Sequence, residues 1–115
     1  MPDHAKNLAS ALALHRAGRM EQAHALYRQI LADEPDNADA MNLLGILLDQ
    51  TGQALAAIDM LRRAVAAQPR SPHFYVSLSA ALTHAGQMPA AADTLKQAPH
   101  AQIWRSVAMR QAPAL

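Results

Sequence analysis

The sequence predicts a single all-α domain built as a solenoid of helix–turn–helix repeats. Three residue types recur with a period of 34 residues along the chain. The residues in step are Gly18, Gly52 and Gly86, Leu14, Leu48 and Leu82, and Ala23, Ala57 and Ala91. Pro35 and Pro69 form a further pair at this spacing. A fixed period in this range is typical of a repeat array, because each unit is too small to bury its apolar face alone.

The composition agrees with closely packed helices. Apolar residues make up 51% of the 115 residues, but 27 residues are Ala and only 3% are aromatic. Ala has the highest helix propensity, and its small side chain lets helices approach closely. Because about three repeats are needed for a stable stack, we expect one domain over residues 1–115.

The first repeat is expected over about residues 4–37. Apolar residues at helical spacing begin at Leu8, and this helix should end at Gly18, since Gly readily adopts the positive φ of a helix end. A second helix should follow from Met20 and end before Pro35. Proline lacks the backbone N–H and disfavours helix in the residue before it.

The second repeat is expected over about residues 38–71, after the capping residues Asp36 and Asn37. Its two helices should meet in a turn at Gly52, and the second of them should stop before Pro69. This repeat therefore has the same plan as the first, one period later.

The third repeat is expected over about residues 72–98. Ser71 is the expected N-cap and Pro72 takes the first helical position, where proline is favoured. The turn is expected at Gly86. Pro99 arrives about four residues earlier than the period would place a proline, so the last helix of this repeat should be short.

A final helix is expected over about residues 101–111. Trp104, Val107 and Ala108 repeat the order of a large, an apolar and a small residue that the earlier first helices show. We expect this helix to cap the open face of the third repeat, because the terminal units of an array need a polar outer face.

The repeated pattern resembles the tetratricopeptide repeat family. That family's signature has a large residue, Leu and a small residue in the first helix, Gly at the turn, and Ala, an aromatic residue, Ala and Pro in the second. The second repeat matches it best, with Met41, Leu44, Gly45, Leu48, Gly52, Ala57, Leu61, Ala64 and Pro69. The resemblance covers residues 4–98 well and 101–111 loosely. It implies a right-handed superhelix with the first helix of each repeat on the concave face.

The resemblance also implies a protein partner, because members of this family commonly hold a peptide or a helix of another protein in the concave groove. Helical phase predicts the residues that face the groove. They are Leu8, Leu12, His15, Arg16, Asp39, Asn42, Ile46, Asp49, Gln50, His73, Val76, Ala80, Thr83 and His84. Apolar residues among these would be poorly placed on a bare surface, and an apolar strip with a polar rim indicates a partner site. The alternative is an ordinary solvated helix face.

One binding mode of the family is not expected. Its chaperone-binding members grip a C-terminal carboxylate with Lys, Asn, Asn, Lys and Arg. The matching positions here hold Leu8, Leu12, Leu43, His73 and Ser77, none of which fits. A carboxylate clamp of that type is therefore not expected.

We expect no metal, no cofactor and no enzymatic activity. None of the six histidines lies four residues from another ligand, although His15, His73 and His84 could share the groove. The acidic cluster of Asp33, Glu34 and Asp36 lacks the glycine and the distal Glu of a calcium loop. No nucleophile elbow, phosphate loop or pair of catalytic acids stands out.

The charge and hydropathy of the sequence limit where the protein is expected in the cell and which classes of partner it should bind. A net charge of +1 gives no general attraction to nucleic acid. No stretch approaches the ~18 apolar residues of a membrane span, and Met1–His4 shows no start of a signal peptide. We therefore expect a cytoplasmic protein without membrane or nucleic-acid partners.

The charges are unevenly distributed, which leaves a second function open. Residues 1–60 hold four Lys or Arg and eight Asp or Glu, a net of −4, whereas residues 61–115 hold six and one, a net of +5. The leading expectation is a non-enzymatic adaptor. The alternative is an assembly or chaperone-type subunit that forms weak homo-oligomers or holds a component of a larger complex. A third expectation is a detached repeat domain of a transferase, because such repeats resemble those that precede some bacterial transferase domains.

Overall fold

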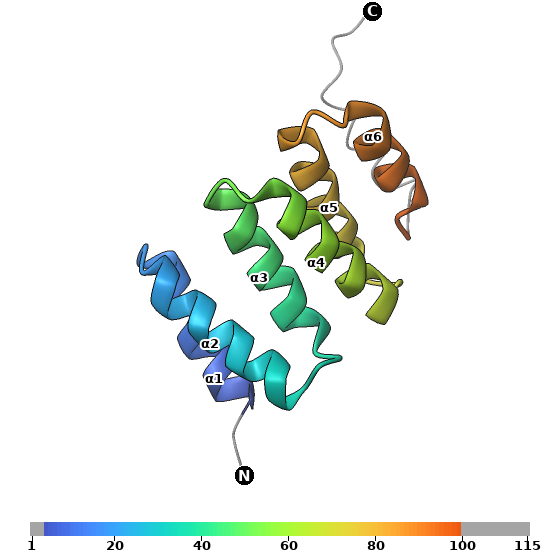
Figure 1. The fold of residues 1–115 in the computed structure, drawn as a ribbon. Helices are drawn as coiled ribbons and strands as arrows, with labels where there is room; N and C mark the ends of the chain where they lie inside the picture. Colours follow the sequence, from blue (N-terminus) through green and yellow to red (C-terminus); the bar gives the residue numbers. More distant parts are fainter. Residues whose placement is uncertain (1–3, 100–115) are drawn as a thin grey trace, which may run out of the picture.

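The computed structural model describes residues 4–99, with side chains from residue 7 onward. In that range the chain forms six helices, α1 His4–Arg16, α2 Met20–Asp33, α3 Ala38–Gln50, α4 Ala54–Ala67, α5 Pro72–His84 and α6 Met88–Gln97. Consecutive helices pair as hairpins, and the three hairpins stack in chain order along an elongated body of 55 × 26 × 22 Å (Figure 1). The predicted all-α array of hairpins is confirmed.

The three predicted glycine turns are confirmed and have the same geometry. Gly18, Gly52 and Gly86 have φ values of 80°, 83° and 80°, in the left-handed region that side chains disfavour. In each turn the residue after the glycine donates a backbone hydrogen bond to the carbonyl five positions earlier in the helix, as Arg19 does to Leu14 at 2.9 Å. This is the Schellman ending of a helix, and its repetition gives the three hairpins the same turn.

The helices begin close to where the sequence predicts, but one predicted capping residue makes no capping bond. The Asn37 side chain accepts a hydrogen bond from the backbone N–H of Ala40 at 3.0 Å, so it caps α3 as expected. Pro72 lies in the first turn of α5. Ser71 is in the N-cap position but makes no side-chain capping bond, because its hydroxyl donates instead to Gln68 Oε1 at 3.2 Å.

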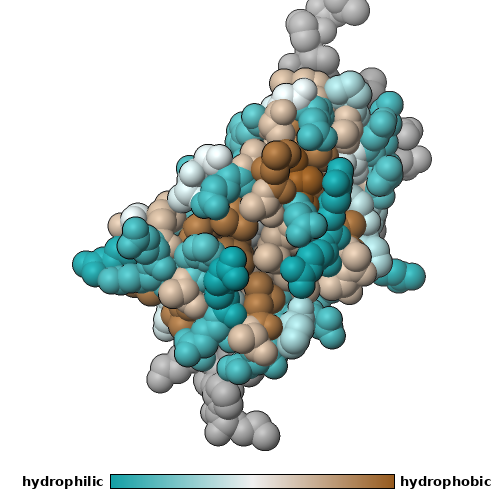
Figure 2. Space-filling model, in the orientation of Figure 1, coloured by the Kyte–Doolittle hydropathy of each residue, from teal (hydrophilic) through white to brown (hydrophobic). Residues whose placement is uncertain are grey.

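The core lies between the two layers of helices, and apolar side chains (brown) also gather along the middle of the face shown in Figure 2. Its largest fully buried side chains are Tyr27, Phe74, Ile30, Leu44, Leu47, Leu61 and Leu82. α3 and α4 approach most closely at Gly45, where an added Cβ would lie 2.5 Å from Leu61 Cγ and 2.6 Å from its Cδ2. Ser79, one period later, donates its hydroxyl to the Ala91 carbonyl at 3.1 Å and so ties α5 to α6. The small residue at this position in each repeat therefore sets how closely the two helices pack.

The last hairpin differs from the first two at its outer face. Tyr27, Leu61 and Leu95 occupy the same position in three successive repeats. Tyr27 and Leu61 are fully buried, whereas Leu95 is 36% exposed within the part of the chain that the structure describes. The expected capping helix, with Trp104 and Val107, lies outside the described residues. That helix remains a prediction.

A side chain at Gly45 should destabilise the fold. We expect Gly45→Ala and Gly45→Leu to lower the free energy of unfolding by about 1–3 kcal/mol, because the new Cβ overlaps the buried Leu61. Chemical denaturation monitored by circular dichroism measures the change. In a Leu61→Ala background Gly45→Ala should cost less than it does alone. Equal costs in both backgrounds would contradict the contact.

Removal of residues 100–115 should promote aggregation, because the deletion would leave Leu95 on an uncapped end face. We expect light scattering to rise with protein concentration in the truncated chain and to fall again when Leu95→Gln is added. A truncated chain with the stability and scattering of the full chain would contradict the capping role.

Candidate functional site

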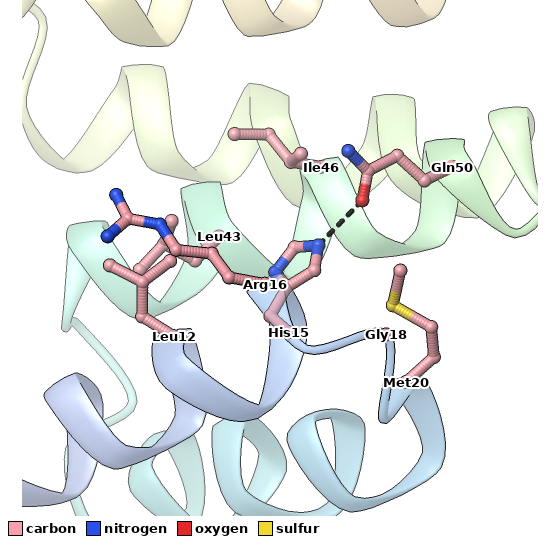
Figure 3. A pocket seen from close by; sticks show the side chains of 8 residues that line it. All are labelled: Leu12, His15, Arg16, Gly18, Met20, Leu43, Ile46 and Gln50. Atoms are coloured by element: carbon pink, nitrogen blue, oxygen red, sulfur yellow. Dashed lines mark hydrogen bonds between the residues drawn. The ribbon is translucent and has the colours of Figure 1, made fainter.

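The three first helices form one side of the array and line a shallow groove. α1 contacts α3, and α3 contacts α5, in the order of the repeats. Between α1 and α3 lies an open hollow of about 460 Å³ (Figure 3). It is lined by Leu12, His15, Arg16, Gly18, Met20, Leu43, Ile46 and Gln50. Five of these residues are in the predicted groove set, so the structure brings that part of the set together.

The apolar part of the groove comes from both flanking helices. Leu12 of α1 and Leu43 and Ile46 of α3 are half-buried along the hollow. Val76 of α5, one period after Asn42, is 40% exposed. Leu8 is half-buried and packs against the core, so it contributes less to the surface than expected.

The prediction from helical phase that His15 faces solvent is wrong. His15 is only 7% exposed, and its ring lies edge-on to the Tyr27 ring with the centroids 5.9 Å apart. His15 Nε2 lies 2.6 Å from Gln50 Oε1 and Nδ1 lies 3.1 Å from the Tyr27 hydroxyl. With the Gln50 oxygen as acceptor, Nε2 carries the proton and Nδ1 accepts from the Tyr27 hydroxyl. His15 therefore joins three helices, α1, α2 and α3.

The Tyr27 phenol is protonated in this arrangement. Burial of the phenol raises its pKa from 10.0 to about 12, an effect that the charge of Arg16 partly offsets. The hydroxyl thus keeps its proton across the neutral range and remains able to donate to His15.

A second hydrogen bond between first helices repeats the one from His15. His84 Nδ1 lies 2.7 Å from Asp49 Oδ2, which links α5 to α3. Asp49 is one period after His15, and His84 is one period after Gln50. The same two positions therefore connect consecutive repeats, in a pattern that we call the groove ladder (His15 with Gln50, and Asp49 with His84).

The prediction that Asn42 faces solvent is also wrong. Asn42 was expected on the solvent-facing stripe of α3 but is only 6% exposed. Its Oδ1 is buried and has no hydrogen-bond partner among the described residues. Asn42 therefore lies beneath the groove and not on its surface.

Besides Val76, six of the predicted groove residues are exposed on the three first helices. They are Arg16, Asp39, Gln50, His73, Ala80 and His84. The Thr83 hydroxyl donates within α5 to the Ser79 carbonyl at 2.9 Å. Sequence reasoning missed Met20, although an apolar residue beside the turn at Gly18 was a usable signal.

Across residues 4–99 no three His, Cys, Asp or Glu side chains come together in a way that could hold a metal ion. Among the same residues no helix is both long and apolar enough to cross a membrane.

Comparisons with known proteins agree with the repeat pattern. A family model described as tetratricopeptide repeat matches residues 8–72, and a second model with the same description matches residues 50–102. The first match alone covers more than half of the chain, and it includes both helices that line the hollow.

Solved structures of the protein MamA have the same fold. One has a TM-score of 0.77 at 20% sequence identity and covers 97% of this chain and 60% of its own. Two MamA point mutants have TM-scores of 0.74 and 0.70 at 21% and 26% identity, and each covers 84% of this chain. The match spans 71% and 56% of those two chains. This chain therefore corresponds to part of the length of MamA.

Loss of the His15 imidazole should destabilise the fold. We expect His15→Ala to lower the free energy of unfolding by about 1–3 kcal/mol, because the buried Tyr27 hydroxyl loses its acceptor. The exposed His73→Ala is the control and should change stability by less than about 0.5 kcal/mol. Urea denaturation at neutral pH measures both. Equal effects of the two substitutions would contradict a structural role for His15.

Proposed function

Because the chain belongs to the tetratricopeptide repeat family, we propose that it is a non-enzymatic adaptor that binds a segment of a partner protein in the groove of α1, α3 and α5. The observation that carries the proposal is the hollow between α1 and α3, where Leu12, Leu43 and Ile46 present apolar surface beside the polar His15 and Gln50. Apolar side chains with a few placed polar groups are the usual lining of a recognition site.

The rest of the groove supports an elongated occupant. Val76 extends the apolar surface on α5, and Arg16, Gln50 and His84 form an exposed polar edge along the three helices. A segment lying across α1, α3 and α5 would contact all three repeats. Extended concave surfaces of this kind are the binding faces of solenoid proteins.

The groove proposal is tested with a partner captured by the full chain from extract of its source organism. We expect Ile46→Glu and Val76→Glu each to weaken binding at least tenfold, because each places a charge on the apolar strip. The control is Leu55→Glu, since Leu55 lies on α4 and is 72% exposed. Calorimetric titration gives the dissociation constants, and circular dichroism checks that each variant is folded. Loss of binding in the Leu55 variant alone would place the partner on the second helices instead.

Weak self-association is the second candidate. It is favoured by the exposure of Leu95 on the last hairpin and by the net charges of −4 and +5 on the two parts of the sequence. Sedimentation velocity at low and high salt separates it from the adaptor function, because attraction between opposite charges weakens as salt rises.

A further inference from the structure

Asp49 is a nearly buried carboxylate whose charge is incompletely compensated. Its side chain is 10% exposed, and Oδ2 accepts a hydrogen bond from His84 Nδ1 at 2.7 Å. Oδ1 is buried and has no hydrogen-bond partner among residues 4–99. No Lys or Arg in the described part of the chain forms an ion pair with it. Burying a carboxylate is costly unless it is paired and hydrogen-bonded on both oxygens.

The groove ladder does not require this charge. At the preceding step the same two positions hold His15 and Gln50, which connect α1 to α3 without a carboxylate. A hydrogen bond between neutral side chains is thus sufficient to join consecutive first helices. The link between α3 and α5 therefore does not need the negative charge of Asp49. A hydrogen bond between these helices does not account for a carboxylate at this position.

The position of Asp49 relates it to the apolar strip. Asp49 follows Ile46 by three residues, so both lie on the same side of α3, about 4.5 Å apart along the helix axis. The side chain that contacts Asp49 Oδ2 is His84, which is 63% exposed and therefore free to move into solvent. Ile46 and Arg16 of α1 line the hollow between α1 and α3, and Arg16 supplies a positive charge there.

We propose that Asp49 binds a lysine or arginine side chain of the partner segment, and that His84 covers the carboxylate when the groove is empty. The inference rests on the proposed function. The incoming ammonium or guanidinium displaces the imidazole and supplies hydrogen-bond donors to both oxygens. An aliphatic side chain within about two residues of it along an extended segment packs on Ile46, since extended chains advance about 3.3 Å per residue. Arg16 repels the basic residue from α1 and so fixes the direction of the segment.

The test uses a phage-displayed library of dodecapeptides selected against the full chain. We expect the enriched peptides to carry Lys or Arg within two positions of an aliphatic residue. One such peptide, synthesised with a fluorophore, is then compared with its Lys→Gln or Arg→Gln form by fluorescence anisotropy. The loss of the basic residue should weaken binding to the unmodified protein at least tenfold. This arm requires no change to the protein, so it does not depend on the folding of any variant.

Protein variants then assign the effect to Asp49. Asp49→Asn should weaken binding of the basic peptide about tenfold, and the neutral peptide should bind this variant no more weakly than it binds the unmodified protein. Asp59→Asn removes the same charge from an exposed position on α4 and should leave binding unchanged. His84→Ala should tighten binding severalfold, because it removes the group that competes for the carboxylate.

The outcomes separate this inference from the proposed function. Peptides without basic residues, bound equally by Asp49→Asn and the unmodified protein but lost in Ile46→Glu, would overturn the role of Asp49 and leave the groove as the binding site. Selected peptides that Ile46→Glu still binds would overturn the proposed groove itself. Equal weakening by Asp49→Asn and Asp59→Asn would show general electrostatic attraction and overturn recognition at Asp49.

Discussion

Each hairpin of this chain can bury its apolar faces only against its neighbours, and the other features of the structure depend on that constraint. Two antiparallel helices alone leave one side of each helix uncovered. Tyr27 and Leu61 are fully buried because a further hairpin follows each of them, whereas Leu95 at the same position in the last hairpin is partly exposed. The small residue at Gly45 lets the two helices of the middle hairpin pack closely around Leu61. The same stacking step places α1, α3 and α5 side by side, and their alignment forms the groove.

The three repeats have the same backbone turn but carry different side chains along the groove. The turn at each glycine is the same, so residues just before one turn contact residues just before the turn of the next repeat. At the first step those residues are His15 and Gln50, and at the second they are His84 and Asp49. In the first pair the buried His15 ring fixes α1 to α3. The second pair has an exposed imidazole over a carboxylate, an arrangement that suits recognition of a cation better than it suits stability.

A repeat fold of this kind does not by itself define a partner, since the same architecture serves many functions. What distinguishes one member from another is the set of side chains on the groove. Here that set includes the apolar side chains of Leu12, Leu43 and Ile46, the cation of Arg16 on α1 and the carboxylate of Asp49 on α3. The arrangement has a direction, because the two charges of opposite sign lie on different helices. A bound segment would therefore be held in one orientation, an effect that charges at an interface provide more readily than raw affinity.

The sequence by itself determined the number of hairpins within residues 4–99, their turns and the apolar face of each helix. These depend on local rules, namely the positive φ of Gly18, Gly52 and Gly86 and the spacing of apolar residues along each helix. Helical phase also predicted five of the eight residues that line the hollow between α1 and α3. It failed at His15 and Asn42, which were expected in solvent and are buried. The phase of a single helix does not report how close the next helix lies. Only the tertiary structure decided that Tyr27 and Gln50, which lie 12 and 35 residues from His15 in the chain, would enclose it. The distance between stacked helices, set by the volume of the side chains between them, therefore separated the buried groove residues from the accessible ones.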